Sequence, residues 1–516
     1  MLTRMPGVAL SVILAGEVAA FIAGMATGTL GYWLLVPPAA AILGFVVLTA
    51  ARRRTDKAPE LAVDDTPNYL LIALPTIVAY AAISPRDSTF GIAVVIVAML
   101  WRGLSPDIRL RPTWQSAILP VLGLAIVLRP MNSTTAPAIL AFGLAGVAIA
   151  GAVYLSASTS SALISLGDGI GLYLIASVVL WLVGAESTGR SGVDGSNTIT
   201  GGIRVLFPLA TAQAATPAAA AVYLAALVPI LLVSSRYRTL RLVAAAAAVV
   251  VLIYADRRGA LIGAFFVAVC ALLAPRLLRR AAPLLVGTAL FMPFIYGSIQ
   301  TVFGQTILTA SSQAQFLQRQ GEGEDAALTL NGRDTIWSRS LDFYQNQVDW
   351  VHQTFGFGSF GNSSSGLADN FRSMFGKTVT NRGDITPHNS LLQILFDGGW
   401  IIGLVFAAIV LYTTWILSRR TSTIDLATLA MLMTLAFVGS TEVALSPAHS
   451  QTTWWILLAL GMIVFSRVVV ASGSDEVGIT GRSSRESGAD QPRSTRSAPA
   501  STTGAATEGE ARGWLP

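Results

Sequence analysis

The chain has 516 residues, of which 53% are hydrophobic and 12% are charged, with a net charge of +6 and a mean hydropathy of +0.63. Soluble domains carry about 25% charged residues, so this composition excludes a soluble globular protein and indicates a membrane protein. The single cysteine, Cys270, excludes a disulfide framework and a cysteine metal site. The arginines stand in short clusters beside apolar runs, as topology signals do, and do not predict nucleic-acid binding.

The apolar runs are long enough to cross a hydrocarbon core of about 30 Å as helices. Because lipid cannot satisfy open backbone groups, they predict an all-α integral membrane protein, a polytopic bundle of about 12–14 transmembrane helices. Arg4 precedes the first run without a clear cleavage site, which favours a first transmembrane helix over a removed signal peptide. The predicted spans are 8–26, 29–50, 68–84, 88–101, 115–129, 136–156, 169–185, 217–235, 242–255, 259–275, 282–300, 399–418, 425–445 and 451–470.

Arginine clusters between these spans indicate the orientation. With a cytoplasmic N-terminus, the basic clusters all fall on the cytoplasmic side, as the positive-inside rule requires. Arg257 and Arg258 then lie outside and break the pattern. They are either an interfacial snorkelling pair or a cationic site for an anionic ligand on the outer leaflet. The cytoplasmic clusters are at 52–57, 102–111, 236–241, 276–280 and 419–420.

The same pattern divides the chain into four predicted regions. An N-terminal transmembrane bundle (1–300) is followed by a large extracytoplasmic loop (301–387) with short helices, and then by C-terminal transmembrane helices (388–470). Residues 471–516, rich in small and polar residues, are predicted to be a disordered cytoplasmic tail. Loops as long as 301–387 are uncommon unless they serve a function, so we expect the chemistry there.

Within the loop, Asn331-Gly332-Arg333-Asp334 predicts a helix start, with Asn331 as N-cap and Asp334 at the positive end of the helix dipole. Arg333 is unfavourable in that turn unless an anion lies nearby; a solvated arginine and an anion-binding arginine fit equally well. The run Gly356–Gly361 matches G-x-G-x-x-G formally. It lacks the flanking strand of a dinucleotide site, and therefore predicts a tight turn.

Thr386-Pro387-His388 predicts a second helix start, with Thr386 as N-cap and Pro387 in the first helical position. The helix dipole there favours a neutral imidazole, which can accept a proton as a general base does. The alternative is a satisfied interfacial histidine. His352 and His449 are separated and lack a carboxylate cluster, so the sequence predicts no catalytic zinc site.

Five motifs occur in order along the chain: Gly201-Gly202-Ile203-Arg204, Asp256-Arg257-Arg258-Gly259-Ala260, Asn331-Gly332-Arg333, Gly356-Phe357-Gly358-Ser359-Phe360 and the segment His388–Gly399. In this order they resemble the O-antigen ligase and O-antigen polymerase superfamily of bacterial membrane glycosyltransferases. The most specific is the segment His388–Gly399, in which histidine and asparagine open an apolar helix that ends in glycine. The resemblance covers about 200–420, and it departs from the family where Phe207-Pro208 follows Arg204.

The resemblance implies a glycosyltransferase in cell-surface polysaccharide biosynthesis that acts on the outer face of the plasma membrane. A glycan passes from polyprenyl pyrophosphate, usually undecaprenyl pyrophosphate, to a hydroxyl of a glycan or lipid-linked acceptor, with no metal or other cofactor. Ligase and polymerase differ in the acceptor and are not separated. The alternative from another class is a membrane transporter or flippase for a lipid-linked or anionic solute; no convincing internal repeat supports it.

The same resemblance implies roles for individual residues. His388 is expected to act as the base, and Arg333 and Arg258 to bind the pyrophosphate. Arg257 is the alternate for Arg258, because the family shows one arginine before Gly-Ala where this chain has two. Further substrate contacts are expected from Arg204 and Asn389.

Overall fold

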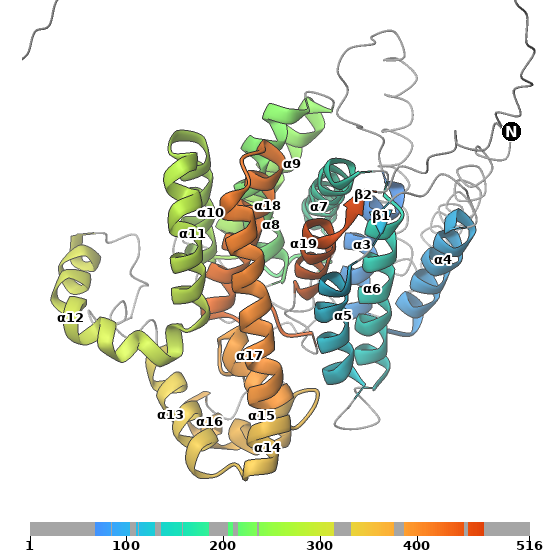
Figure 1. The fold of residues 1–516 in the computed structure, drawn as a ribbon. Coiled ribbons are helices and arrows are strands. Elements are labelled where there is room, and N and C mark those ends of the chain that lie inside the picture. The colour runs from blue at the N-terminus through green and yellow to red at the C-terminus, as the bar shows by residue number, and fades with distance from the viewer. Residues whose placement is uncertain are drawn as a thin grey trace, which may run out of the picture. The chain divides into compact units, whose positions relative to one another are not determined.

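The computed structural model is an all-α membrane protein, with two short strands in addition to the helices (Figure 1). It describes residues 68–468 apart from 84, 104–109, 112, 129–135, 157, 185–204, 210–214, 235–236, 314–331, 376–385 and 448–452. The helices before the loop are α3 (Tyr69–Ile83), α4 (Pro85–Gly103), α5 (Trp114–Val127), α6 (Ala136–Tyr154), α7 (Thr159–Leu182), α8 (Ala215–Val233), α9 (Arg238–Tyr254), α10 (Arg258–Leu273), α11 (Pro275–Leu290) and α12 (Met292–Gln313). The loop and the C-terminal part contain α13 (Arg333–Asn346), α14 (Trp350–Phe355), α15 (Gly361–Ser364), α16 (Leu367–Phe375), α17 (Ser390–Arg419), α18 (Thr423–Thr441) and α19 (Trp454–Phe465).

By length and apolar composition alone, three described helices could each cross a membrane: α7, α17 and α18. The pair α11 and α12 passes the same test together, but the two are bent by 100°. Helices also occupy the other predicted spans that fall on described residues, and most of these helices carry an apolar stretch of 10–17 residues. The predicted spans 8–26 and 29–50 and the predicted tail lie outside the described residues.

The prediction of one continuous span over 282–300 is wrong, because the chain turns sharply between α11 and α12. Pro293 is the second residue of α12. Proline has no N–H to donate to the preceding turn, and it disfavours helical backbone in the residue before it. The helix therefore ends and restarts in a new direction.

A buried ion pair joins α7 and α9. Arg241 donates from Nε and Nη2 to the two carboxylate oxygens of Asp168, at 2.7 and 3.0 Å. Its Nη1 binds the carbonyl of Ser234 at 2.9 Å, and the side chain is only 2% exposed. Arg241 is therefore a packing residue of the bundle, and not the exposed loop charge of the predicted 236–241 cluster.

Two short strands, β1 (Leu110–Arg111) and β2 (Arg467–Val468), pair antiparallel and connect the segment before α5 to the chain after α19. Next to them, the hydroxyl of Thr113 donates to the carbonyl of Phe465 at 2.8 Å. These contacts hold α5 beside α19.

The predicted loop contains four described short helices, α13–α16, which Figure 1 shows gathered beside one end of α17. Two of them, α13 and α16, form a separate core with the first turns of α17, around the buried Trp337, Tyr344, Phe371 and Phe396. The rings of Tyr344 and Phe396 meet edge to face at a centroid distance of 5.1 Å. The loop is thus anchored to the helix that follows His388.

The glycine run of the loop packs on a kink in α17. Gly399 (φ 71°, ψ −174°) interrupts the helical backbone, and Gly356 (φ 73°, ψ −179°) lies opposite, both in a region open essentially only to glycine. The N–H groups of Phe357 and Gly358 donate to the carbonyls of Phe396 and Asp397, each at 2.8 Å. The predicted tight turn is confirmed. The backbone at Gly356 and the backbone at Gly399 approach each other so closely that neither position has room for a Cβ.

We expect Gly361→Ala to destabilise the protein strongly. A Cβ at this position would collide with the carbonyl group of Phe396, a backbone atom that cannot rotate away. Overpacking of this kind costs at least about 1–3 kcal/mol, measurable as a lower unfolding temperature in detergent. Gly297→Ala in α12 is the matched control, since nothing lies within 4 Å of its added Cβ. Equal unfolding temperatures for the two variants would contradict the packing described here.

Candidate active site

The chain re-enters the bundle at Asn389, which determines where α17 begins. The Asn389 side chain accepts a hydrogen bond from the N–H of Leu392 at 2.9 Å and is the N-cap. The prediction that Thr386 caps this helix and that His388 lies in its first turn is therefore wrong. His388 precedes the helix with a left-handed backbone (φ 48°), and the hydroxyl of Thr386 accepts from its N–H at 3.4 Å. Asn389, and not Thr386, caps the helix because its side chain reaches the N–H of the third helical residue, Leu392.

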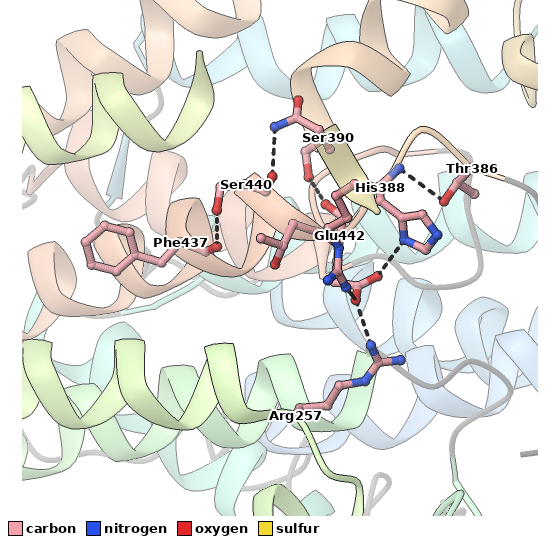
Figure 2. Close-up of polar contacts among 10 residues, drawn as sticks. Arg257, Thr386, His388, Ser390, Phe437, Ser440 and Glu442 are labelled. Carbon is pink, nitrogen blue, oxygen red and sulfur yellow. Dashed lines mark hydrogen bonds and ion pairs between the residues drawn. The ribbon is translucent and has the colours of Figure 1, made fainter. Parts of the chain in front are cut away.

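Two residues at the start of α17 hold the end of α18. The Asn389 amide donates to the carbonyl of Ser440 at 3.1 Å, and the Ser390 hydroxyl donates to the carbonyl of Glu442 at 2.8 Å (Figure 2). Ser390 also accepts from the N–H of Leu445 at 3.1 Å. These bonds position Glu442, the C-cap of α18, directly beside His388.

Arg257 reaches the same place because of how α9 ends. The N–H of Arg257 donates to the carbonyl of Leu252, and the N–H of Asp256 to that of Ile253, at 3.4 and 3.2 Å. This is a Schellman motif, with Asp256 (φ 50°) in the left-handed position that glycine usually occupies. Arg257 then becomes the N-cap residue of α10, and its Nη1 binds Glu442 Oε1 at 2.7 Å.

Arg333 approaches Glu442 from the loop. It is the first residue of α13, whose N-cap is Gly332 (φ 80°), and not Asn331 as predicted. Its Nη2 binds Glu442 Oε1 at 3.0 Å, and its Nε donates to the carbonyl of Thr441 at 3.1 Å. A cation at the carbonyl end of α18 is favoured by the helix dipole. The anion that Arg333 needs is therefore Glu442.

His388 completes the cluster on the other carboxylate oxygen. Its Nδ1 lies 3.4 Å from Glu442 Oε2, while both guanidinium groups share Oε1 (Figure 2). The side chains of Arg257, Arg333 and His388 are 18%, 20% and 25% exposed, whereas Glu442 is 7% exposed. One buried carboxylate thus holds three groups that border the surface.

Electrostatics favour the ionised form of Glu442. Burial alone would raise the pKa of its carboxyl group, but the charge of Arg257, the hydrogen bond from His388 and the charge of Arg333 together hold the pKa well below its usual range. A depressed pKa means that the ionised carboxylate stabilises the fold at neutral pH. This stabilisation is lost only when the pH falls below the usual glutamate range and through the lowered value.

The geometry suits proton abstraction next to an anion-binding site. An Nδ1–H donated to Glu442 fixes the tautomer and leaves Nε2 as the unprotonated nitrogen of His388. Two guanidinium groups beside it can make charge-assisted hydrogen bonds to phosphate oxygens. The same carboxylate contacts the imidazole and both guanidinium groups.

The structure brings His388, Arg333 and Arg257 together, from three distant parts of the sequence. Asn389 is fully buried; its Oδ1 caps α17, and its Nδ2 donates to the carbonyl of Ser440 at the end of α18. Arg258 is the first residue of α10, and its side chain is not among those described. Arg204 lies outside the described residues. The next residue, Val205, donates to the carbonyl of Tyr254 at 2.9 Å, near the turn that carries Arg257.

The remaining histidines are elsewhere. His352 is half-exposed on α14, where it binds Asp349 and stacks on Phe357 at 4.3 Å between ring centroids. His449 lies outside the described residues. Among the described side chains, no group of three or more histidine, cysteine and carboxylate residues could hold a metal ion.

Sequence reasoning missed Glu442 as a site residue. The signal was present: Glu442 lies inside the predicted span 425–445, and a carboxylate in an apolar run is costly unless it has a function. Its partners could not be identified, because they are 185, 109 and 54 residues away in the chain.

Searches of curated proteins and of solved structures gave no match. The family model described as O-antigen ligase matches residues 243–407, about a third of the chain. The matched segment contains Arg257, Arg333 and His388 and most of α17, while Glu442 lies beyond its end. Residues 243–407 are thus similar to the O-antigen ligase family, and this similarity covers the segment that carries the cluster around Glu442 apart from Glu442 itself.

Proposed function

We propose that this protein transfers a glycan from a polyprenyl pyrophosphate to an acceptor hydroxyl at the extracytoplasmic face of the membrane. The observation that supports this most strongly is that a histidine and two arginines share one buried carboxylate, Glu442. A glycan leaving a pyrophosphate needs a base for the incoming hydroxyl and positive charge for the leaving group, and these are the groups assembled here.

In the proposed mechanism Arg257 and Arg333 bind the pyrophosphate. A phosphate group offers several oxygens to both guanidiniums at once, whereas Glu442 offers them a single shared oxygen. The donor therefore competes with Glu442 for both arginines. As the bond from the anomeric carbon to the pyrophosphate oxygen breaks, the negative charge that develops on pyrophosphate is stabilised by the two guanidiniums, without a divalent cation.

His388 Nε2 takes the proton of the acceptor hydroxyl as its oxygen attacks the anomeric carbon, opposite the departing pyrophosphate. Attack from that side inverts the anomeric configuration. Glu442 stabilises the imidazolium that forms, because its Oε2 faces Nδ1. A well-placed base of this kind contributes about 10²–10⁴-fold to the rate. These groups act on the acceptor hydroxyl and on the pyrophosphate. They do not select the acceptor molecule, and a ligase and a polymerase differ in that molecule.

Transfer in proteoliposomes that contain polyprenyl-pyrophosphate-linked glycan and an acceptor tests the proposal. We expect Arg257→Ala and Arg333→Ala each to lower kcat/KM for the donor by about 10²–10³-fold, the loss expected when one donor to a developing anion is removed. Arg339→Ala is the matched control, because Arg339 is exposed on the same helix, α13, as Arg333. Transfer should persist in the presence of a chelator.

Arg258→Ala, measured in the same assay, decides which arginine of the pair acts. Wild-type transfer rates for both Arg257→Ala and Arg333→Ala would contradict the proposed pyrophosphate-binding site. Movement of the donor across the bilayer without transfer of its glycan would support the alternative, a flippase, and overturn the glycosyltransferase.

A further inference from the structure

A second polar cluster lies on α17, away from the Glu442 site, and the mechanism above does not use it. It centres on Asp397, whose side chain is 1% exposed. Its Oδ1 accepts from the N–H of Gly361 and from Nε2 of Gln393, each at 2.8 Å, and its Oδ2 accepts from the hydroxyl of Ser446 at 3.0 Å. These are the hydrogen bonds of the carboxyl group within the described residues, and no arginine or lysine is among the donors.

The three donors come from three different parts of the chain. Gly361 belongs to the glycine turn of the loop, Gln393 to the first turns of α17, and Ser446 to the segment after Glu442. Gln393 Nε2 also donates to Asn362 Oδ1 at 3.0 Å, and this leaves the buried Gln393 Oε1 without a partner. Gln393 Nε2 thus bridges the loop, through Asn362, and the carboxyl group of Asp397.

Each of these parts adjoins the candidate active site. Gln393 is one helical turn after Asn389, the residue that follows His388. Ser446 is four residues after Glu442, and the intervening residues are buried. The loop that carries Gly361 also carries Arg333 on α13. A group that binds all three segments fixes their relative positions.

We propose that Asp397 is a positioning residue that locks the glycine turn, the start of α17 and the segment after Glu442 into one arrangement, and so sets the contact between His388 and Glu442. The effect of Asp397 on catalysis rests on the proposed glycosyltransferase activity. Asp397 does not touch the reacting groups; it acts through the backbone segments that carry His388 and Glu442. A buried carboxyl group with three donors is costly to remove, because every donor is then left unsatisfied.

Asp397→Asn tests the lock with the smallest change in shape. The amide offers one acceptor oxygen in place of two, so its N–H group faces either Ser446 or the N–H donors of Gly361 and Gln393. In nanodiscs, we expect hydrogen exchange of residues 356–361 to become at least about tenfold faster, because the protection of Gly361 N–H depends on Oδ1. Asp342→Asn, an exposed aspartate on α13, is the matched control and should leave this exchange unchanged.

The same variants are then assayed for transfer. A looser lock weakens the hold of Glu442 on the imidazole, so the midpoint of the acid limb of the pH–rate profile should move to lower pH and kcat should fall about tenfold or more. Loss of folded protein alone would lower the rate without moving that midpoint. Ser446→Ala frees only the segment after Glu442; it should shift the midpoint without changing exchange at residues 356–361.

The two readouts separate the lock from the reaction. Wild-type exchange in residues 356–361 together with a wild-type pH profile in Asp397→Asn would overturn the lock while leaving the glycosyltransferase intact. Faster exchange with an unmoved midpoint would overturn its link to His388. Absence of transfer by the wild-type protein would overturn the proposed function, and the exchange measurement would still decide whether Asp397 holds the loop.

Discussion

His388→Ala is expected to lower the rate of glycan transfer by about 10²–10⁴-fold, the usual contribution of a positioned general base. The variant keeps Glu442 paired with Arg257 and Arg333, since both guanidiniums bind Oε1 and His388 binds Oε2. Donor binding should therefore change little, and the loss should appear in kcat. Initial rates in proteoliposomes over a range of donor concentrations measure both quantities.

His352→Ala is the matched control for this experiment. His352 is also a loop histidine paired with a carboxylate, but it lies on α14 with Asp349 and not at the arginines. We expect the control to retain wild-type kcat. Equal losses in the two variants would mean that the loop tolerates no histidine substitution and would remove the evidence for His388 as the base. Full activity of His388→Ala would overturn the proposed mechanism.

Glu442→Gln is expected to separate kcat from the donor KM in a way that no other substitution at this site does. The amide is nearly the same size but carries no charge, so it no longer stabilises the imidazolium of His388. We expect kcat to fall by about 10²–10³-fold, within the range of a lost general-base contribution. The donor KM should fall as well, because the carboxylate no longer competes with pyrophosphate for Arg257 and Arg333.

Binding of inorganic pyrophosphate to the detergent-solubilised protein checks the second part directly. Glu442→Gln should bind it more tightly than the wild type, whereas Arg333→Ala should bind it more weakly. Asp342→Asn again serves as the control for loss of one carboxylate charge on the surface. Weaker pyrophosphate binding by Glu442→Gln would show that Glu442 supports the arginine site by structure alone and does not compete with the donor.

The starts of α13 and α17 could be predicted in part from local sequence patterns. Both were located to within about three residues, because capping residues mark such sites clearly. The caps themselves were misassigned: Gly332 and Asn389 replace Asn331 and Thr386. Several polar residues stand side by side at each start, and which of them caps depends on the backbone that tertiary contacts impose. His388 takes its left-handed conformation beside Glu442, and no local pattern predicts this.

The contact between Gly356 and Gly399 could not be predicted from sequence motifs. The run at Gly356 predicts a tight turn because glycine permits unusual backbone angles. That the turn lies against Gly399 follows only from the packed backbones, where a Cβ on Gly399 would collide with the carbonyl group of Thr354. Likewise, the sequence shows Asp397 only as a carboxylate in an apolar segment. Its three donors, Gly361, Gln393 and Ser446, are known only from the tertiary structure.

By itself, the sequence determined the membrane class and the helical architecture, because hydropathy is a local property of the chain, and its short motifs indicated the resemblance to the O-antigen ligase family. It also singled out His388 and Arg333. Only the tertiary structure decided that Arg257 joins them and that Glu442 holds all three. The reason is physical: a buried charge must find its partners in space, and these partners come from helix ends that are distant in sequence.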